Sequence, residues 1–167
     1  GEKVFIGSRS QERGQQIAQE LGQLASSVSH SITGGTNEEA SSQADLVLLT
    51  TPYEGQKETL EALRPRLVGK IVVNVIAPLA FERGRATAIH VPEGSAALQS
   101  KAILPDSTIV GAFQNMSAEE LLVPDRRVEC DVIVCADDAE ARKAVMALAE
   151  KIQGVRAVNG GGLATAH

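Results

Sequence analysis

Aromatic side chains are almost missing from this sequence. Its 167 residues include one tyrosine, three phenylalanines and no tryptophan, 2% in all. Single-stranded nucleic acids are held by stacking their bases on aromatic rings, so this composition argues against that class of partner. The core has to be built from Val, Ile, Leu and Ala, an alphabet typical of parallel sheets that are covered by helices.

Positive charge and long apolar runs are scarce as well. The 16 Lys and Arg residues are outnumbered by 21 Asp and Glu residues, which gives a net charge of -5. Nucleic-acid binding needs clustered Lys and Arg, so we expect no such partner. No run of about 18 apolar residues occurs, which argues against a membrane-spanning helix. The sequence opens in a strand pattern, so we expect no secretory leader.

Cysteine occurs only twice, at Cys130 and Cys135. Five positions apart in a strand pattern, the two side chains point to opposite faces, which argues against a mutual disulfide and a shared metal ion. We expect both to be reduced core residues of a cytoplasmic protein. The three histidines, His30, His90 and His167, are scattered along the chain, so we expect no metal site.

What remains is an alternation of strand and helix patterns. Hydrophobic residues make up 43% of the chain and charged residues 22%, which is the balance of a globular domain. The alternation predicts βαβ units, and therefore one α/β domain over residues 1–167. We expect a Rossmann-like, doubly wound and mainly parallel sheet with helices on both faces. The expected strands are 3–7, 44–52, 70–78, 107–113, 130–138 and 155–158, and the expected helices are 11–24, 53–67, 97–101 and 139–152.

The segments between these elements are predicted to be less regular. Residues 31–43 are expected to form a loop and a short helix capped by Asn37, and residues 79–94 an irregular stretch. Residues 114–127 form a polar loop in this prediction. Asp137 and Asp138 are expected to cap the last long helix.

Ser8, Arg9 and Arg13 follow the first predicted strand and begin a helix. In doubly wound sheets, ligands bind beyond the carboxyl ends of the strands, and a small polar residue with an arginine there accommodates the 2′-phosphate of NADP. A guanidinium group binds phosphate through two parallel hydrogen bonds. Cations are mildly unfavourable at a helix N-terminus, so two of them there point to an anion. The alternative interpretation is that Arg9 and Arg13 are solvated surface residues without a ligand.

A Gly-rich turn that holds the pyrophosphate should precede this strand in such a fold, after a first strand of its own. The sequence shows neither, which would leave one edge of the strand at 3–7 unpaired. Two glycine-containing stretches, TGGTN at 33–37 and NGGGLATA at 159–166, do not fit the fingerprint. We interpret both as tight turns.

Several stretches together resemble the F420-dependent NADP reductases. They are GSR at 7–9 and the segments 31–54, 70–78, 93–121 and 131–163, in the family's order and over nearly the entire chain. The family begins with a strand and a Gly-rich turn and ends with helices after the GGGL position, so this sequence is similar to the interior of a family member. The resemblance implies an enzyme that transfers a hydride between NADP(H) and the deazaflavin cofactor F420, and a homo-oligomer, most simply a dimer.

The resemblance also implies roles for individual residues. Ser8, Arg9 and Arg13 match the contacts to the 2′-phosphate, and a second group, after the next two strands, is expected along the ribose, pyrophosphate and nicotinamide. A third group matches the loop that approaches the deazaflavin, with Gln114 where family members often carry His. The cofactors carry the chemistry, so no catalytic acid or base is assigned. The second group is Thr50, Pro52, Tyr53, Asn74, Ile76 and Ala77, and the third is Gln114, Asn115 and Met116, with Ala118 beside them.

Two other functions stay open at this point. The first is another NADP(H)-dependent reductase of the same fold that acts on an imine or a carbonyl. The second is a non-catalytic module for nucleotide binding or protein interaction that lacks the phosphate loop.

Overall fold

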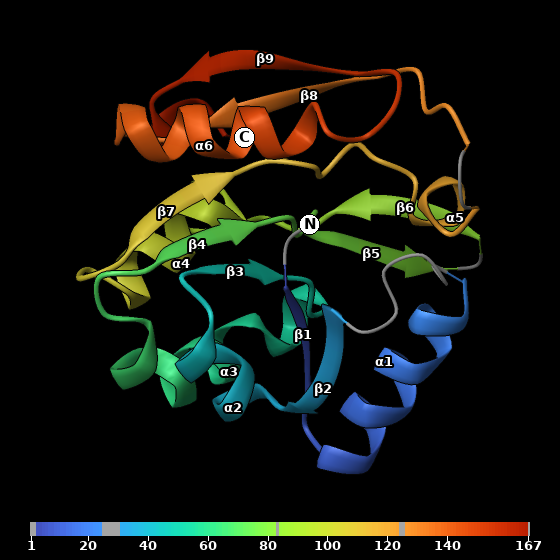
Figure 1. Cartoon of the computed structure of the whole chain (residues 1–167). Helices are drawn as coiled ribbons and strands as arrows, with labels where there is room; N and C mark the ends of the chain where they lie inside the picture. Colours follow the sequence, from blue (N-terminus) through green and yellow to red (C-terminus); the bar gives the residue numbers. More distant parts are fainter. Residues whose placement is uncertain (1–2, 25–30, 83, 124–125, 167) are drawn as a thin grey trace.

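The structure of the chain is a computed structural model that describes residues 3–24, 31–82, 84–123 and 126–166. Strands and helices alternate along most of it (Figure 1). The strands are β1 (Val4–Ser8), β2 (Ile32–Thr36), β3 (Leu46–Leu49), β4 (Ile71–Asn74), β5 (Leu79–Glu82), β6 (Arg85–Ala88), β7 (Thr108–Gly111), β8 (Cys130–Cys135) and β9 (Val155–Gly161). The helices are α1 (Gln11–Leu24), α2 (Asn37–Gln43), α3 (Tyr53–Leu67), α4 (Ala96–Ile103), α5 (Ala118–Leu121), α6 (Ala139–Ala149) and the 3-10 helix η2 (Leu163–Thr165).

The strands form a large sheet, a two-stranded sheet and a hairpin. The large sheet has five strands in the order β3-β4-β7-β8-β9, and β1 pairs with β2 alone in the described part of the chain. Pairing is parallel except between β7 and β8, which meet in antiparallel fashion at Gly111 and Cys135. The predicted class, an α/β fold with a mainly parallel sheet, is confirmed.

Both faces of the large sheet are buried, because its central strands alternate their side chains between two cores. Val72 and Ile109 pack with α3 and α4 on one face. Val73 and Val110 pack with α6 on the other face. Continuous apolar runs are what a strand needs when helices cover it on both sides. Strands are found within the predicted ranges 70–78 and 107–113, but both end earlier than predicted, β4 at Asn74 and β7 at Gly111.

The strand prediction at 3–7 is confirmed in position but not in burial. Val4 remains 43% exposed and Gly7 is exposed, whereas Phe5, Ile6 and Ser8 are half-buried. Leu48 of β3, a strand of apolar residues, is also 47% exposed. β1 and β3 each pair with a single strand in the described part of the chain, so an apolar sequence alone does not bury them.

The loop and turn predicted at residues 31–36 are wrong, because these residues form β2. β2 pairs in parallel with β1 from Ile32 to Thr36. Its glycines permit helix α1 to lie directly on the strand: a Cβ atom on Gly34 would collide with the main-chain oxygen of Gly14, and one on Gly14 with that of Gly35. Glycine serves close helix–strand packing here instead of a turn.

The stretch 159–166 is not a tight turn either. Asn159, Gly160 and Gly161 extend β9, and the pairing with β8 shifts by one residue between Val134 and Cys135. Gly160 is the extra residue of this bulge, and Gly161 has a φ of +86°, which favours glycine. Leu163 then packs into the core with α3 and α4.

The stretch predicted to be irregular, 79–94, contains a hairpin instead. β5 and β6 pair in antiparallel fashion, and the hairpin lies beyond the ends of β3 and β4 toward which their arrows point (Figure 1). Phe81 is 74% exposed on it. The segment 114–127 likewise includes a short helix, α5, at Ala118–Leu121.

Helix ends follow capping side chains. The N-cap of α2 is Thr36 rather than Asn37, because its hydroxyl accepts from the Glu39 N–H while the Glu39 carboxylate accepts from the Thr36 N–H. Asp138 caps α6 as predicted, accepting from the Ala141 N–H at 2.8 Å. Helix α6 ends at Ala149, before the predicted end at residue 152. Among the described residues, no helix has the length and apolar composition that crossing a bilayer requires.

Candidate functional site

The carboxyl ends of β3, β4 and β7 lie at one edge of the large sheet. The three strands are neighbours and run in the same direction, so their ends meet there (Figure 1). In open α/β sheets this edge is where ligands bind. The sequence places Thr50, Asn74 and Gln114 at or just beyond these ends, and the structure brings these three segments to the same edge.

The end of β4 is organised around Asn74, whose side chain is 0% exposed. Its amide nitrogen donates to Gln56 Oε1 and Ser100 Oγ, both at 2.8 Å. Its side-chain oxygen accepts from the Ile76 N–H at 3.0 Å. All of these partners belong to the protein, and Ile76 itself is only 6% exposed. Of the predicted residues in this turn, Ala77 alone is exposed.

The end of β3 holds a polar atom that sequence reasoning missed. Thr51 Oγ1 is buried and has no hydrogen-bond partner among the described residues. Helix α3 begins directly after it, with Pro52 as an N-cap that provides no side-chain hydrogen bond. A buried hydroxyl without a partner beside an uncapped helix start suits a ligand that supplies acceptor oxygens. The signal in the sequence was the second threonine of the pair that ends the strand.

The other predicted residues near this strand end differ in access. Thr50 and Pro52 are exposed. Tyr53 is half-buried against the core with α3 and α4, and its hydroxyl accepts from Gln99 Nε2 at 3.4 Å. Its ring therefore packs under the edge of the sheet.

The turn after β7 carries the predicted deazaflavin residues. Phe113 has a φ of +69°, a strained value for a residue other than glycine. Gln114 is exposed, and its side chain donates to the Asn74 carbonyl oxygen at 3.0 Å. Asn115 donates to the Asp131 carbonyl oxygen at 2.8 Å, while Met116 packs against the core with α6. Ala118, the first residue of α5, is exposed.

Ser8, Arg9 and Arg13 lie at the carboxyl end of β1 and the start of α1. Both arginines are exposed, and neither forms a salt bridge within the described residues. Ser10 accepts from the Arg13 N–H at 3.3 Å and so begins the helix. The two guanidinium groups are therefore available to an anion. No hydrogen bond or ion pair among the described residues joins these three to the edge of the large sheet.

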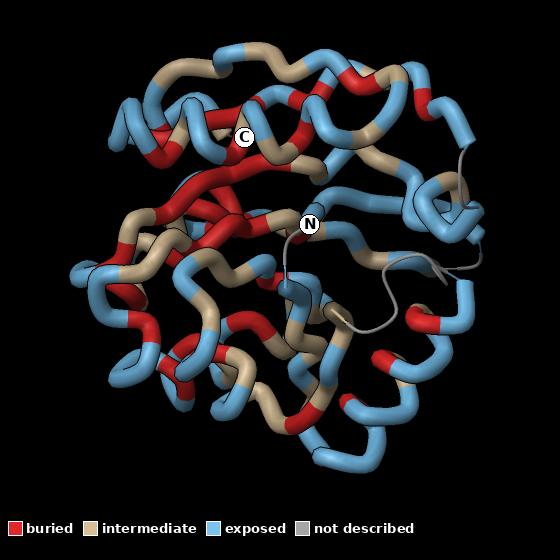
Figure 2. The backbone as a smooth tube through the Cα atoms, in the orientation of Figure 1, coloured by how far each residue is buried: buried red, intermediate tan, exposed pale blue. Residues whose placement is uncertain are grey.

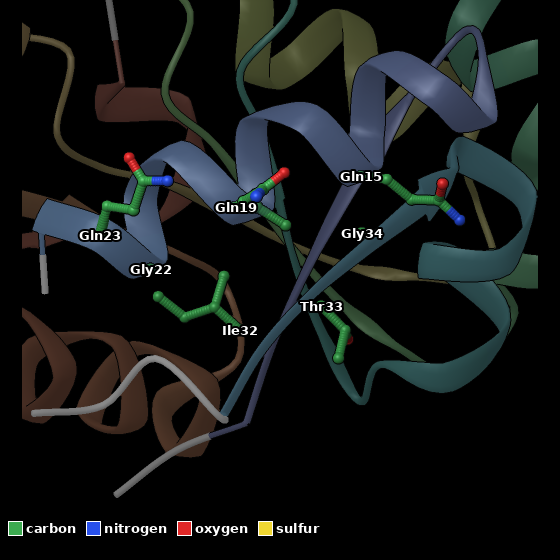
Figure 3. A pocket seen from close by; sticks show the side chains of 8 residues that line it. Gln15, Gln19, Gly22, Gln23, Ile32, Thr33 and Gly34 are labelled. Atoms are coloured by element: carbon green, nitrogen blue, oxygen red, sulfur yellow. The ribbon is translucent and has the colours of Figure 1, made fainter. Parts of the chain in front are cut away.

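A hollow in the structure lies away from this edge. It measures about 630 Å³ and lies between α1 and β2, lined by glutamines of the helix and by Ile32, Thr33 and Gly34 of the strand (Figure 3). Because α1 runs back along β1, Gly22 and Gln23 lie far from the helix start that carries Arg13. We therefore assign the candidate site to the carboxyl edges of the strands, not to this hollow.

The edge of the large sheet offers hydroxyl, amide and main-chain groups. Residues 50–53, 75–78 and 112–116 contain no His, Cys, Asp or Glu. Of the histidines, His90 is exposed, and His30 and His167 lie outside the described residues. Nowhere in the described part of the chain do three or more His, Cys, Asp and Glu side chains gather as metal ligands would. The edge can bind and orient a ligand, which suits chemistry that is carried by cofactors.

Comparison with known proteins identifies the family. A family model described as "NADP oxidoreductase coenzyme F420-dependent" matches residues 1–78. The F420-dependent NADP reductase of Methanocaldococcus jannaschii is 37% identical over 165 residues, covering 96% of this chain and 74% of that protein. This chain belongs to the F420-dependent NADP reductase family. The family member from Methanothermobacter thermautotrophicus is 35% identical over 171 residues, covering 100% of this chain and 74% of that protein.

Solved structures agree on the fold of this F420-dependent NADP reductase family member. A crystal structure described as a candidate F420-dependent NADP reductase from Arthrobacter has a TM-score of 0.82 and 24% identity, and it covers 99% of this chain and 77% of that one. Other similar structures include pyrroline carboxylate reductases, with TM-scores of 0.53. These likenesses confirm the Rossmann-like class.

Proposed function

We propose that this chain catalyses hydride transfer between NADP(H) and the deazaflavin cofactor F420. The observation that carries the proposal is the similarity to reductases of that name, which extends over nearly the whole chain. The composition of the edge supports it, because its polar groups can position ligands and need supply no proton-transfer residue. An imine or carbonyl reductase has weaker support, since structures of that kind share only the fold.

The residues at the strand ends fit NADP(H). Arg9 and Arg13 are exposed cations without acidic partners in the described chain, and Ser8 adds a hydroxyl. These three would hold the 2′-phosphate by charge-assisted hydrogen bonds. Within the described part of the chain, Thr51 Oγ1 near the start of α3 has no hydrogen-bond partner, and a ribose or phosphate oxygen would satisfy it. Thr50, Pro52 and Ala77 would line the path toward the nicotinamide.

The turn after β7 would receive the deazaflavin. Gln114 and Ala118 are exposed there, and Asn115 and Met116 hold the turn against β8 and the core. When bound, NADP(H) and F420 supply the hydride donor and acceptor. The residues of these turns would hold the two ligands so that their reacting atoms are close. Because an amide does not titrate, Gln114 contributes orientation without moving a proton.

The test is turnover. Purified protein is mixed with NADPH and oxidised F420, and loss of the visible deazaflavin absorbance is followed against reactions that lack protein or contain NADH. We expect F420 reduction with NADPH and much less with NADH. Absence of turnover with F420, together with reduction of an imine or carbonyl by NADPH, would overturn the proposal.

We further propose that the protein acts as a homodimer in the cytoplasm. Exposed apolar side chains on the hairpin and at and just beyond the end of α5, namely Phe81, Leu121, Leu122 and Val123, support self-association. The free cysteines Cys130 and Cys135 suit a reducing compartment. Analytical ultracentrifugation tests the first part: a monomer at micromolar concentration would contradict it.

A further inference from the structure

Three polar side chains are fully buried beneath the carboxyl end of β4. They are Gln56 of α3, Asn74 of β4 and Ser100 of α4, each 0% exposed, and we call them the amide cluster. Asn74 donates to both of the others, and Gln56 Nε2 donates to the Ala96 carbonyl oxygen at 3.0 Å. The cluster thus ties two helices to the end of one strand from inside the core.

The amide cluster is linked by hydrogen bonds to the turn after β4. Asn74 Oδ1 accepts from the Ile76 N–H at 3.0 Å, so the buried side chain fixes the main chain two residues further on. Such a bond holds the turn in one conformation. The side chain itself faces the protein interior and is not accessible to a ligand. What this turn presents to a cofactor is therefore its main chain and Ala77.

The main-chain oxygen of Asn74 anchors the second turn. It accepts from the Ala112 N–H at 3.2 Å and from Gln114 Nε2 at 3.0 Å. The residue between them, Phe113, has a φ of +69°, a conformation that surrounding contacts must hold in place. One peptide group, fixed by the amide cluster, therefore sets the relative placement of the turns after β4 and β7.

We propose that the amide cluster and Gln114 are positioning residues for hydride transfer. In the proposed function, the turn after β4 lies at the nicotinamide and the turn after β7 at the deazaflavin, so Asn74 sets the separation of the two rings. Buried polar side chains are costly unless fully hydrogen-bonded, and in return a satisfied network specifies one geometry. This inference rests on the proposed function but makes a separate claim about the free protein.

The first experiment replaces Gln114 by methionine, which keeps the length and removes the donor. Gln153→Met is the control, an exposed glutamine beyond the end of α6. We expect kcat for F420 reduction to fall about 10- to 100-fold, because misplacement by about 1 Å has an effect of that order. KM for NADPH and the thermal midpoint should stay near the values of the unmodified protein. Equal kcat in the two variants would contradict the proposal.

The second experiment measures hydrogen exchange in the protein without ligands. Asn74→Ala is compared with Ser107→Ala, which removes a buried hydrogen bond to the Leu67 carbonyl oxygen before β7, away from the carboxyl edge. We expect hydrogen exchange of the Ile76 amide to accelerate at least about tenfold in the first variant only, since local opening sets exchange. Unchanged exchange at Ile76 would overturn the proposal.

The two experiments separate the inference from the proposed function. If the unmodified protein does not reduce F420, the proposed function fails, and the exchange of Ile76 still decides whether the cluster fixes the turn. If Asn74→Ala does not fold, the kinetics of Gln114→Met decide instead, because Gln114 is exposed and its replacement leaves the core unchanged.

Discussion

β1 and β4 have similarly apolar sequences but different surroundings. Val72 and Val73 of β4 are 0% exposed, whereas Val4 of β1 is 43% exposed. β4 lies between two strands and under helices on both faces, while β1 has β2 as its partner in the described chain. Figure 2 shows the same contrast as a buried centre in the large sheet and mostly exposed or half-buried backbone around β1 and β2. Burial follows from the neighbours of a strand more than from its own residues.

The contrast matters for the proposed site, which draws on both regions. The turns after β4 and β7, which we expect at the nicotinamide and the deazaflavin, belong to the large sheet, and the amide cluster fixes them. Arg9 and Arg13 belong to the two-stranded sheet, which contacts the remainder chiefly through α2. Regions with few buried contacts open at lower free energy. We therefore expect the 2′-phosphate end of the site to be more dynamic than the ring end.

The largest expected difference comes from the same substitution in both strands. Val73→Ala removes two buried methyl groups and leaves a cavity, which should lower the free energy of unfolding by about 2 to 3 kcal/mol. Val4→Ala removes side-chain surface that is already partly in water, so its effect should stay below about 1 kcal/mol. Urea denaturation measures both. Equal losses would mean that β1 is as well packed as β4.

A glycine substitution tests whether the small sheet has a tight contact of its own. Gly34→Ala would force β2 and α1 apart, because its Cβ collides with the main chain of Gly14, and should cost about 1 to 3 kcal/mol. Gly55→Ala in the first turn of α3 meets nothing within 4 Å and should stabilise by about 0.4 to 1 kcal/mol. Thermal denaturation should show a lower midpoint for Gly34→Ala and a higher midpoint for Gly55→Ala. A neutral Gly34→Ala would refute the direct packing of α1 on β2.

A substitution at the start of α2, the helix that connects the two regions, should affect mainly the two-stranded sheet. Thr36→Ala removes the cap of α2, which contacts both β1 and α3, and should cost about 1 kcal/mol. Hydrogen exchange should then accelerate in β1 and β2 while β4 and β7 keep their protection. Uniform acceleration across both sheets would instead indicate a single cooperative unit.

The smallest effect is expected at an exposed ion pair of β8 and β9. Arg156 Nε donates to Asp131 Oδ1 at 2.8 Å, and this hydrogen bond lowers the pKa of Asp131 below its usual 3.8. A lowered pKa adds stability above pH 3.8, which is lost as the pH falls through the folded-state value. Arg156→Gln should therefore lower the thermal midpoint slightly at pH 7. Well below the folded-state pKa of Asp131 the two proteins should converge, and a difference that persists there would exclude the ion pair as its cause.

Sequence patterns predicted the longest helices and the strands that helices cover on both faces. The helices at 11–24 and 53–67 and the strands through Val73 and Val110 are found where apolar periodicity placed them. β2 was missed because TGGT carries little apolar signal, and its glycines serve the contact with α1. The hairpin was missed because the side chains of β6 are all exposed, so no alternation toward a core marks that strand.

The candidate site was predictable at the level of strand ends but not of side chains. Which residues follow β3, β4 and β7 can be read from the sequence, because parallel strands end at a common edge. The inward direction of Asn74 could not, since it depends on Gln56 and Ser100, 18 and 26 positions away. Thr51 was overlooked because only the packed structure shows that its hydroxyl is buried without a hydrogen-bond partner among the described residues.

The claim that Arg9 and Arg13 grip the 2′-phosphate can be tested by nucleotide titration. Dissociation constants for NADPH and NADH are measured by calorimetry for the unmodified protein, for Arg9→Gln with Arg13→Gln, and for Arg64→Gln as an exposed control on α3. Loss of charge-assisted hydrogen bonds worth about 1.5 to 3 kcal/mol should weaken NADPH binding to the double variant about 10- to 100-fold. The dissociation constant of NADH for the double variant should be unchanged. Arg64→Gln should bind both nucleotides as the unmodified protein does. Equal weakening of NADPH and NADH, or none, would contradict the account.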